Sequence, residues 1–374
     1  MKKIGICTFY NNNNYGSYLQ AYALKSYLKR VGYDAYIIDF ADCSKAWNKK
    51  LRYKTIWSRV KCLLSNPKLL IETVKAKFIS RQQSTICSNS LVEKFRYFKN
   101  DYLKPYTENF IEDKFDAFIV GSDQVWKVSM PGLHFVFFLR FCTPNKRISY
   151  AASLGSETIP SYNKKDLFKC LKEFKAISVR ESSAVTLLDD MGKGVPATLV
   201  LDPVLLIGNN FWQESITPIA KAKYVFMYFL DPVLENEKLI ANLLSKYSDC
   251  RIYMIYTGVR LQTIANVDYI EPSPLEFVSY INSAELVITD SFHGSAFSIL
   301  LNKEFYILPR NYKIYAGQST RIFSLLKLFG CEDRLIYDSK TIKSIRSIDW
   351  SSINIKMNEM QIISSDYLHN AIEA

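Results

Sequence analysis

Along most of the chain, short apolar runs alternate with segments whose apolar residues recur every three or four positions. The first pattern predicts buried strands and the second predicts amphipathic helices. The predicted strands are 4–9, 35–40, 115–120, 147–152, 176–179, 198–201, 224–230, 251–256, 285–289 and 304–308. The predicted helices are 16–31, 161–174, 181–191, 235–247, 274–283, 294–302, 319–329 and 352–373. Such alternation indicates an α/β protein with parallel sheets.

A break in this pattern near 205–220 separates two halves of similar size. Pro203 and the turn-forming stretch Gly208-Asn209-Asn210 stand at the break, and 374 residues suffice for two domains. We expect an N-terminal α/β lobe at 1–205, a C-terminal α/β lobe at 206–350 and a final helix at 351–374. The repeated alternation predicts two Rossmann-like lobes that face a cleft.

Composition changes this picture little. No run of about 18 apolar residues predicts a membrane span. The short apolar stretch near the N-terminus is followed by asparagines rather than by a cleavage site, so we expect a cytoplasmic protein. The eight cysteines include no C-x-x-C pair. We therefore expect buried thiols and no metal site.

Charge is concentrated in one segment. Residues 41–105 contain fifteen basic and four acidic residues, a net +11 out of +12 for the whole chain, with tryptophans and leucines interleaved. We expect a helical insertion in the first lobe, and three interpretations are open. They are solvated helix faces, a patch that binds the inner membrane face peripherally, and a nucleic-acid surface. No nucleic-acid motif supports the third interpretation, so we expect no nucleic-acid partner.

Four polar turns at strand ends carry the candidate chemistry. The first is rich in asparagine and precedes the first helix. Its amide side chains and the N–H groups of the helix start suit a sugar or a phosphate, and a plain N-cap is the alternative. The glycine spacing of dinucleotide sites and P-loops is absent here. The candidate binding residues are Asn14, Tyr15, Gly16 and Ser17.

The second turn follows the strand predicted at 115–120. Its glycine permits a tight turn, and its polar side chains match the hydrogen-bonding groups of sugar hydroxyls. Its tryptophan either stacks on a sugar face or fills the core. The candidate binding residues are Gly121, Ser122, Asp123, Gln124 and Trp126.

The third turn begins at Arg180, where an apolar strand ends and a helix begins. A guanidinium in this position is suited to hold a carboxylate or a phosphate in a bidentate manner. The alternative is an ion pair with Glu181 or Asp202.

The fourth turn, after the strand predicted at 285–289, holds His293, one of three histidines in the chain. Open α/β sheets bind ligands at the carboxyl ends of their strands, and a helix start attracts anions. His293 is therefore a candidate for acid–base chemistry on an anionic substrate, and a histidine that merely caps the helix is the alternative. The other candidates in and near this turn are Asp290, Ser291, Gly294, Ser295, Arg310 and Arg321.

Eight short stretches of the chain occur together in a known family. They are 8–9, 14–24, 115–126, 148–155, 178–181, 201–203, 289–294 and 320–322. In these stretches the chain resembles the polysaccharide pyruvyl transferases. The resemblance runs from residue 1 to about residue 337, and it covers 41–105 and the tail poorly.

The resemblance implies a two-lobed fold of the GT-B type. It also implies transfer of an enolpyruvyl unit from phosphoenolpyruvate to a saccharide, which forms a pyruvate ketal in cell-surface polysaccharide and releases phosphate. No metal, cofactor or nucleotide-sugar donor is implied. The acceptor would lie against Asn14, Tyr15, Gly16 and the turn at 121–126. If the acceptor is lipid-linked, the basic segment 41–105 would bring the enzyme to it at the membrane surface.

For the reaction that the resemblance implies, His293 is the candidate for the proton transfers. Asp290 or Asp123 is the candidate for stabilising an oxocarbenium-like intermediate. At one position the chain departs from several branches of the family, which carry an arginine where Ser291 stands. The cation for the donor would then come from Arg180, Arg310 or Arg321. Two other functions remain open, namely a GT-B glycosyltransferase that uses a nucleotide sugar and an inactive saccharide-binding protein.

Overall fold

The computed structural model divides the chain into two compact units. Unit 1 comprises Met1–Phe78, Lys99–Ile207 and Glu359–Ala374, and unit 2 comprises Ile79–Phe98 and Gly208–Asn358. The structure describes residues 1–10, 13–39, 56–57, 60, 63–65, 70–71, 88–106, 112–128, 132–192, 196–219, 222–231, 236–258, 260–310, 319–343 and 345–374. Most of the insertion predicted at 41–105 thus lies outside the described residues, which include all of 88–105 but few residues of 41–87.

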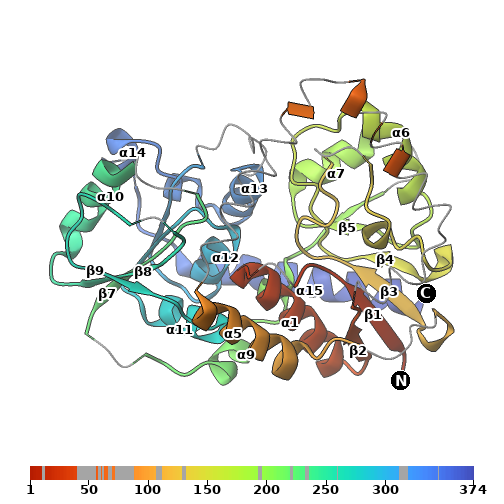
Figure 1. Ribbon diagram of the computed structural model, residues 1–374, viewed down its shortest axis with the longest axis horizontal. Helices are drawn as coiled ribbons and strands as arrows, with labels where there is room; N and C mark the ends of the chain where they lie inside the picture. The colour runs from red at the N-terminus through yellow and green to blue at the C-terminus, as the bar shows by residue number, and fades with distance from the viewer. Residues whose placement is uncertain are drawn as a thin grey trace. The chain divides into compact units, whose positions relative to one another are not determined.

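Unit 1 is built on a parallel four-stranded sheet with the order β2-β1-β3-β4 (Figure 1). Two isolated bridges, Ile148 to Ala176 and Ala152 to Val179, continue the sheet towards the strand pair β5-β6. The strands are β1 (Lys3–Cys7), β2 (Asp34–Ile37), β3 (Ala117–Val120), β4 (Arg147–Ser149), β5 (Ser178–Val179) and β6 (Thr198–Leu199). Strands that follow one another in the chain thus lie side by side, except for β2 and β3, which are separated by β1.

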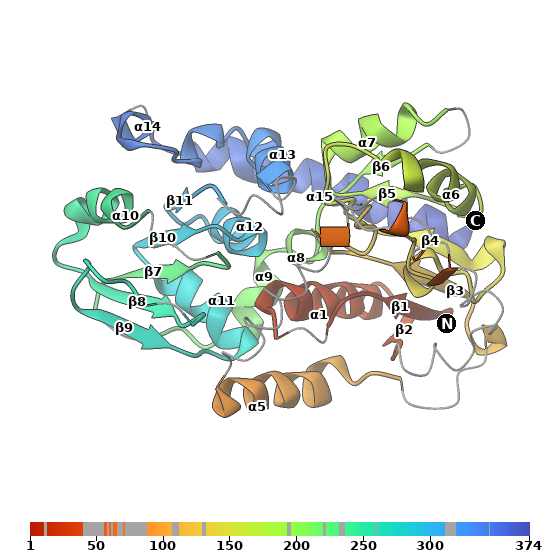
Figure 2. The same ribbon diagram turned by 45° about the horizontal axis from the view of Figure 1, so that its top comes forward.

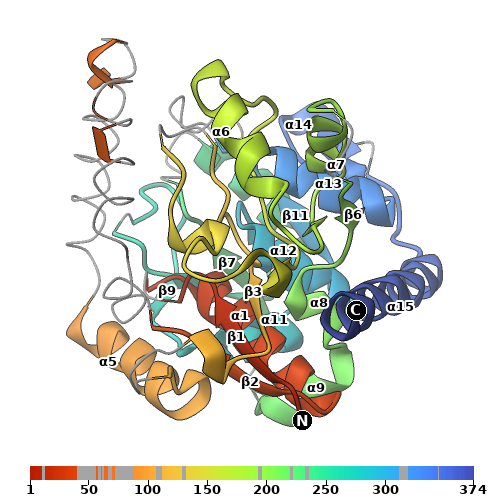
Figure 3. The same ribbon diagram turned by 90° about the vertical axis from the view of Figure 1, so that its right-hand side faces the viewer.

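Helices cover both faces of this sheet. On one face α1 (Tyr15–Arg30) packs against β2 and against α8 (Pro203–Leu206). The C-terminal part of α15 (Trp350–Glu373) lies beside α8, where Gln361 Nε2 donates to the Leu205 carbonyl at 2.7 Å (Figure 3). The other face carries α6 (Ser161–Leu171) and α7 (Ser182–Asp189).

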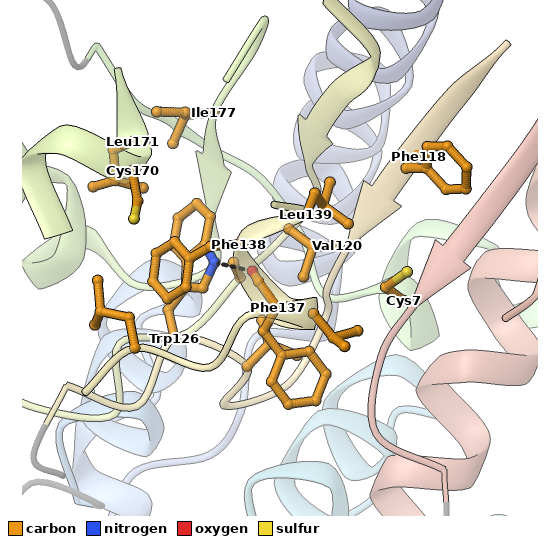
Figure 4. Packing of buried hydrophobic residues seen from close by; sticks show 14 of the residues in the cluster. Cys7, Phe118, Val120, Trp126, Phe137, Phe138, Leu139, Cys170, Leu171 and Ile177 are labelled. Carbon is orange, nitrogen blue, oxygen red and sulfur yellow. Dashed lines mark hydrogen bonds between the residues drawn. The ribbon is translucent and has the colours of Figure 1, made fainter. Parts of the chain in front are cut away.

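The core on that second face is rich in aromatic residues. Cys7, Phe118 and Val120 of the central strands pack with Phe138 and with apolar residues of α6 (Figure 4). Trp126 lies within this cluster, 1% exposed, and its indole Nε1 donates to the Phe137 carbonyl at 2.8 Å. The alternation of β-strand side chains accounts for this segregation, because residues two apart share a face.

Unit 2 is built on a parallel five-stranded sheet with the order β11-β10-β7-β8-β9. Its strands are β7 (Tyr224–Tyr228), β8 (Arg251–Ile255), β9 (Val267–Ile270), β10 (Leu286–Thr289) and β11 (Phe305–Ile307). Read from the first strand of the unit, the order is 3-2-1-4-5, which is that of a doubly wound Rossmann-like domain.

The helices of unit 2 also lie on both faces of its sheet. On one face α10 (Glu237–Leu244) packs on Val225 and Met227, and on the other α11 (Pro274–Ser283) brings Phe277 and Tyr280 against Phe226 (Figure 2). The described residues of this unit also form α5 (Asn89–Phe98), α9 (Asn209–Ser215), α12 (Phe292–Leu300), α13 (Ser319–Phe329), α14 (Ser339–Lys343) and the first part of α15. The predicted α/β class with two Rossmann-like lobes is therefore confirmed.

The division of the chain differs from the predicted domains in two segments. The boundary at Ile207 and Gly208 falls within the predicted interval of 205–220. However, α5 belongs to unit 2, where Ser88 Oγ and Lys94 Nζ donate to Glu271. The end of α15 belongs to unit 1, where Ser364 Oγ accepts the Leu201 N–H at 2.9 Å.

Some elements were not predicted. The strand β9 escaped detection because all four of its residues are only half buried, so its sequence lacks a continuous apolar run. The helices α8 and α9 have four and seven residues, too few for a helical period to stand out.

Candidate functional site

The main sheet of each unit has one point where the strand order reverses, and three of the four predicted polar turns lie at these points, while the third, at Arg180, follows β5. In unit 1 this point is between β1 and β3, and in unit 2 it is between β7 and β10. At such points the loops that follow neighbouring strands diverge to opposite faces, which leaves room for a ligand beyond the carboxyl ends of the strands. The first two turns come together in unit 1, and the fourth lies in unit 2.

In unit 1, a buried hydrogen-bond network joins the ends of β1 and β3. Thr8 Oγ1 donates to the Ser122 carbonyl at 3.0 Å, and Gln20 Nε2 donates to Thr8 Oγ1 at 2.8 Å. Gln20 Oε1 in turn accepts the Ser122 N–H at 3.1 Å. Gly121 is required here, because its φ is +114° and a Cβ would lie 2.1 Å from the Tyr150 carbonyl oxygen.

The start of α1 meets this network through Ser17. Asn14 caps the helix by accepting the Ser17 N–H at 3.2 Å, as its N-cap alternative predicts. Ser17 Oγ donates to Asp123 Oδ2 at 2.8 Å, which joins the first predicted turn to the second. Tyr15 and Gly16 are buried in the first turn of the helix. Hydroxyl and carboxylate groups thus gather at one place in unit 1.

Arg180 is the centre of this cluster rather than an open anion site. Its side chain is 1% exposed and forms an ion pair with Asp202 at 2.6 Å. It also lies 3.3 Å from Asp123 and 3.5 Å from Glu181, and its Nη1 donates to Ser122 Oγ at 3.2 Å. Burial alone would lower the pKa of Arg180, but the three carboxylates outweigh it and the pKa is raised. The ion-pair alternative therefore holds, and we reassign Arg180 from the donor to the support of Asp123.

Trp126 also differs from its predicted role as a platform for a sugar. It is stacked on Phe138 with ring centroids 5.6 Å apart, inside the aromatic core. The side chain of Gln124 is turned away from Asp123 and lies over Gly155. Only its backbone N–H contributes to the cluster, by donating to Asp123 Oδ1 at 2.8 Å. The hydrogen-bonding groups placed at the end of β3 are thus Ser122 and Asp123.

In unit 2, Asp290 follows β10 and reaches across to the end of β7. Its Oδ1 accepts the Leu230 N–H at 2.7 Å, and its Oδ2 accepts the Asp231 N–H at 2.9 Å. Burial raises the pKa of Asp290 to about 6, against the lowering effect of Arg310 and of the two amides.

His293 lies in the first turn of α12, one residue after the helix begins. Ser291 is the N-cap, and its Oγ accepts the Gly294 N–H at 3.4 Å. Gly294 lies against Thr289, where a Cβ would be 2.7 Å from Oγ1. Ser295 Oγ donates to the Ser291 carbonyl at 2.9 Å. His293 is 6% exposed, so the imidazole is held in a packed helix start with a positive dipole end.

Two arginines lie near this helix start. Arg310 follows β11 and its Nε donates to the Asp290 carbonyl at 3.1 Å. The guanidinium of Arg321, on α13, lies 6.0 Å from the ring of Phe292. The residues of the fourth turn thus come together with both predicted cations of the C-terminal half.

Sequence reasoning missed several members of both clusters. In unit 1 they are Thr8 and Gln20, and in unit 2 they are Leu230, Asp231 and Phe292. Thr8 follows β1 directly, and Leu230 and Asp231 lie within three residues of the end of β7. Their positions near strand ends could have marked them as candidates. Which of them come together depends on the strand order, which local sequence patterns do not predict.

Two further observations concern the described residues alone. Within them, no group of three or more His, Cys, Asp or Glu side chains is arranged to hold a metal ion. No helix in the same residues is long and apolar enough to cross a membrane.

Comparisons with solved structures gave distant similarities. The UDP-bound MnaA of S. aureus is 12% identical, with 100% of this chain and 91% of that chain covered and a TM-score of 0.45. The UDP-GlcNAc 2-epimerase of Neisseria meningitidis, bound to UDP-GlcNAc, is 12% identical, with 99% and 100% covered and a TM-score of 0.46. The spinosyn rhamnosyltransferase SpnG is 10% identical, with 99% and 96% covered and a TM-score of 0.41. Similarities this low support no argument about function.

The family comparison is more informative. No curated protein matches the sequence. The model of the polysaccharide pyruvyl transferase family matches residues 14–312, which is most of the chain. This range contains most members of both clusters, from Asn14 at the start of α1 to Arg310 after β11, while Thr8 and Arg321 lie just outside it. The chain therefore belongs to the polysaccharide pyruvyl transferase family.

Proposed function

We propose that this protein transfers the enolpyruvyl unit of phosphoenolpyruvate to two hydroxyls of a saccharide, forming a pyruvate ketal and releasing phosphate. The observation that carries the proposal is the placement of His293, Arg310 and Arg321 around the start of α12, at the strand-order reversal of unit 2. Phosphoenolpyruvate bears a carboxylate and a phosphate, and arginines and helix N-termini bind such groups.

The reaction balances with the groups present. One saccharide hydroxyl adds to the central carbon of the enolpyruvyl unit while the methylene carbon gains a proton and becomes a methyl group. Phosphate then leaves, and the second hydroxyl completes the ketal. Of the two hydroxyl protons, one replaces the proton given to the methylene and the other leaves with phosphate. In the proposal His293 donates the proton to the methylene carbon, since imidazole can exchange protons near neutral pH.

The saccharide is proposed to bind in unit 1. Ser17 and Asp123 place a hydroxyl and a carboxylate at the reversal of its sheet, and such groups pair well with sugar hydroxyls. Ser122 is buried and supports them through its bond to Asp202. Asp123, held by Ser17 and Arg180, is suited to accept a proton from an attacking hydroxyl. We propose further that the acceptor is lipid-linked and that the basic segment 41–105 brings the enzyme to the membrane surface.

Donor-dependent release of phosphate tests the proposal. The purified chain is incubated with phosphoenolpyruvate and a panel of hexopyranosides that carry free 3,4- or 4,6-diols. We expect phosphate release that requires both compounds and a product heavier by a pyruvate ketal. Calorimetric titration measures binding of phosphoenolpyruvate alone. Binding of UDP-sugars in place of phosphoenolpyruvate would favour a glycosyltransferase, and binding of saccharide alone would favour an inactive binding protein.

A further inference from the structure

The carboxylate of Asp290 is already engaged by the protein backbone. Its side chain is 3% exposed, and each of its two oxygens accepts an N–H from the chain that leaves β7, one from Leu230 and one from Asp231. These bonds, at 2.7 and 2.9 Å, tie the ends of β7 and β10 together at the reversal of the sheet.

The same residue holds Arg310 by two different groups. Arg310 Nε lies 3.5 Å from Asp290 Oδ2 and donates to the Asp290 backbone carbonyl at 3.1 Å. A guanidinium is planar and rigid, so fixing Nε on one residue fixes the direction of the edge that carries Nη1 and Nη2. The side chain of Arg310 is 11% exposed, compared with 3% for Asp290, so the arginine is the more accessible member of the pair.

A carboxylate that stabilises a developing cation must lie against the reacting carbon. Asp290 does not meet this condition, because it is buried and its oxygens point at two amides and at Nε. We infer that Asp290 is a positioning residue, which fixes the Arg310 guanidinium and the end of β7 for the donor instead of touching the reacting atoms. The inference rests on the proposed function for its consequence in catalysis, and on the contacts above for its structural part.

The structural part is tested without any substrate. The Nε–H signal of Arg310 is assigned by NMR from its loss in Arg310→Lys, and its hydrogen exchange is measured in the wild type and in Asp290→Asn. The asparagine keeps the size of the side chain but turns an NH2 group towards one of its former donors. We expect exchange to become at least tenfold faster. Unchanged exchange in a variant that melts as the wild type does would overturn the inference, whatever the substrate proves to be.

The catalytic part is tested by a double-mutant cycle on phosphoenolpyruvate affinity, measured by calorimetry. We expect Asp290→Asn and Arg310→Lys each to weaken binding about tenfold, and the double variant to be little worse than either, because the two residues act as one unit. A fully additive double variant would show that Asp290 does not act through Arg310. A loss of turnover in Asp290→Asn at unchanged affinity would restore the direct role and also overturn the inference.

A matched pair supplies the control. Arg251 and Asp268 form an exposed ion pair at 3.1 Å, formed by β8 and β9 of the same sheet. Asp268→Asn is expected to leave both readouts unchanged. If the wild type itself does not bind phosphoenolpyruvate, the proposed function fails, while the exchange measurement still decides whether Asp290 positions Arg310.

Discussion

The strand-order reversals of the two units have the same architecture, but the arginines near them differ in exposure and in the number of carboxylates around them. In unit 1, Arg180 is 1% exposed and lies within 3.5 Å of Asp202, Asp123 and Glu181. In unit 2, Arg310 is 11% exposed and is held by Asp290 along its Nε edge. A guanidinium enclosed by three carboxylates organises hydroxyl groups around it, whereas one anchored at Nε beside a helix start is suited to meet an anion.

The difference concerns two arginines that were both predicted as cations for the donor. Arg180 was predicted to hold an anion because it ends an apolar strand, and Arg310 was predicted as an alternative cation for the donor because it lies near the fourth turn. Asp202, the ion-pair partner that buries the Arg180 guanidinium, lies 22 residues later in the chain and also caps α8 with its carboxylate. Contacts between distant segments therefore give the two arginines different surroundings, and the proposed function places the saccharide at unit 1 and the charged donor at unit 2.

The largest effect is expected at the closed charge cluster of unit 1. Asp202→Ala removes the 2.6 Å partner of Arg180 and leaves a buried cation with less compensation. Such losses cost about 3–5 kcal/mol of unfolding free energy. Urea unfolding measures the change, and Asp249→Ala, which removes an exposed partner of Lys223, is the control at below about 1 kcal/mol. A cost for Asp202→Ala no larger than the control would show that the cluster is not closed, and the contrast between the units would disappear.

The second effect is a pH dependence carried by Asp290. Its raised pKa of about 6 means that the folded state holds this proton more tightly than the unfolded state, whose carboxyl titrates near its usual pKa of about 4. Protonation of Asp290 therefore favours folding, and its contribution rises as pH falls from about 7 to about 4, by up to about 3 kcal/mol. Of the charged groups near Asp290, Arg310 lowers its pKa and the Asp231 carboxylate raises it.

The measurement is the unfolding free energy of the wild type minus that of Asp290→Asn, across this pH range. The subtraction removes the titration of all other carboxylates. A difference that grows towards low pH is expected, and Asp249→Asn should give a flat one. A difference that shrinks towards low pH would mean that the amides and Arg310 outweigh burial, and would place Asp290 in the same class as the ionised partners of Arg180.

The third effect concerns catalysis in unit 2. His293→Ala is expected to lower phosphate release at least about 100-fold, equivalent to about 2.7 kcal/mol of transition-state stabilisation, because the proton donor is lost. The melting temperature should change little. His369→Ala, which alters a histidine on the exposed side of α15, is the control. Activity within a few-fold of the wild type would refute the acid–base role and leave His293 as a residue of the helix start.

The sequence allowed most elements to be predicted because buried parallel strands are apolar throughout. The helix predicted at 274–283 matches α11 residue for residue, since Ser273 and Glu276 form a capping box that marks its start. The half-buried strand β9 has no such signal. Local patterns thus located the polar turns, three of which lie at the reversals of the two main sheets.

The direction of side chains was less predictable. Trp126 and Arg180 lie in turns that were correctly placed, yet both point into unit 1 because their partners, Phe138 and Asp202, arrive from later segments. The bonds from Asp290 to Leu230 and Asp231 likewise span about 60 residues. Contacts of this kind depend on strand order, which local periodicity does not encode.

A third region carries the charge that neither reversal uses. Residues 41–105 hold a net +11, and the described part of this segment includes Ile56, Trp57, Val60 and Leu64, all exposed. Exposed apolar residues interleaved with basic ones suit the surface of an anionic membrane, where the proposed lipid-linked acceptor would be met. Each basic residue close to such a surface contributes about 1 kcal/mol.

The smallest effect is therefore expected for a single neutralisation in this segment. Lys54→Gln should weaken binding to vesicles with anionic lipids about fivefold, in line with about 1 kcal/mol, and changing Lys49, Lys50, Arg52 and Lys54 together to Glu should abolish it. Co-sedimentation at rising salt measures both, since screening shortens the reach of the attraction to about 8 Å at physiological strength. Ile362→Ser, which removes an exposed apolar residue outside the segment, is the control. Negligible binding of the wild type to both anionic and neutral vesicles would refute membrane recruitment and leave this charge as a solvated surface.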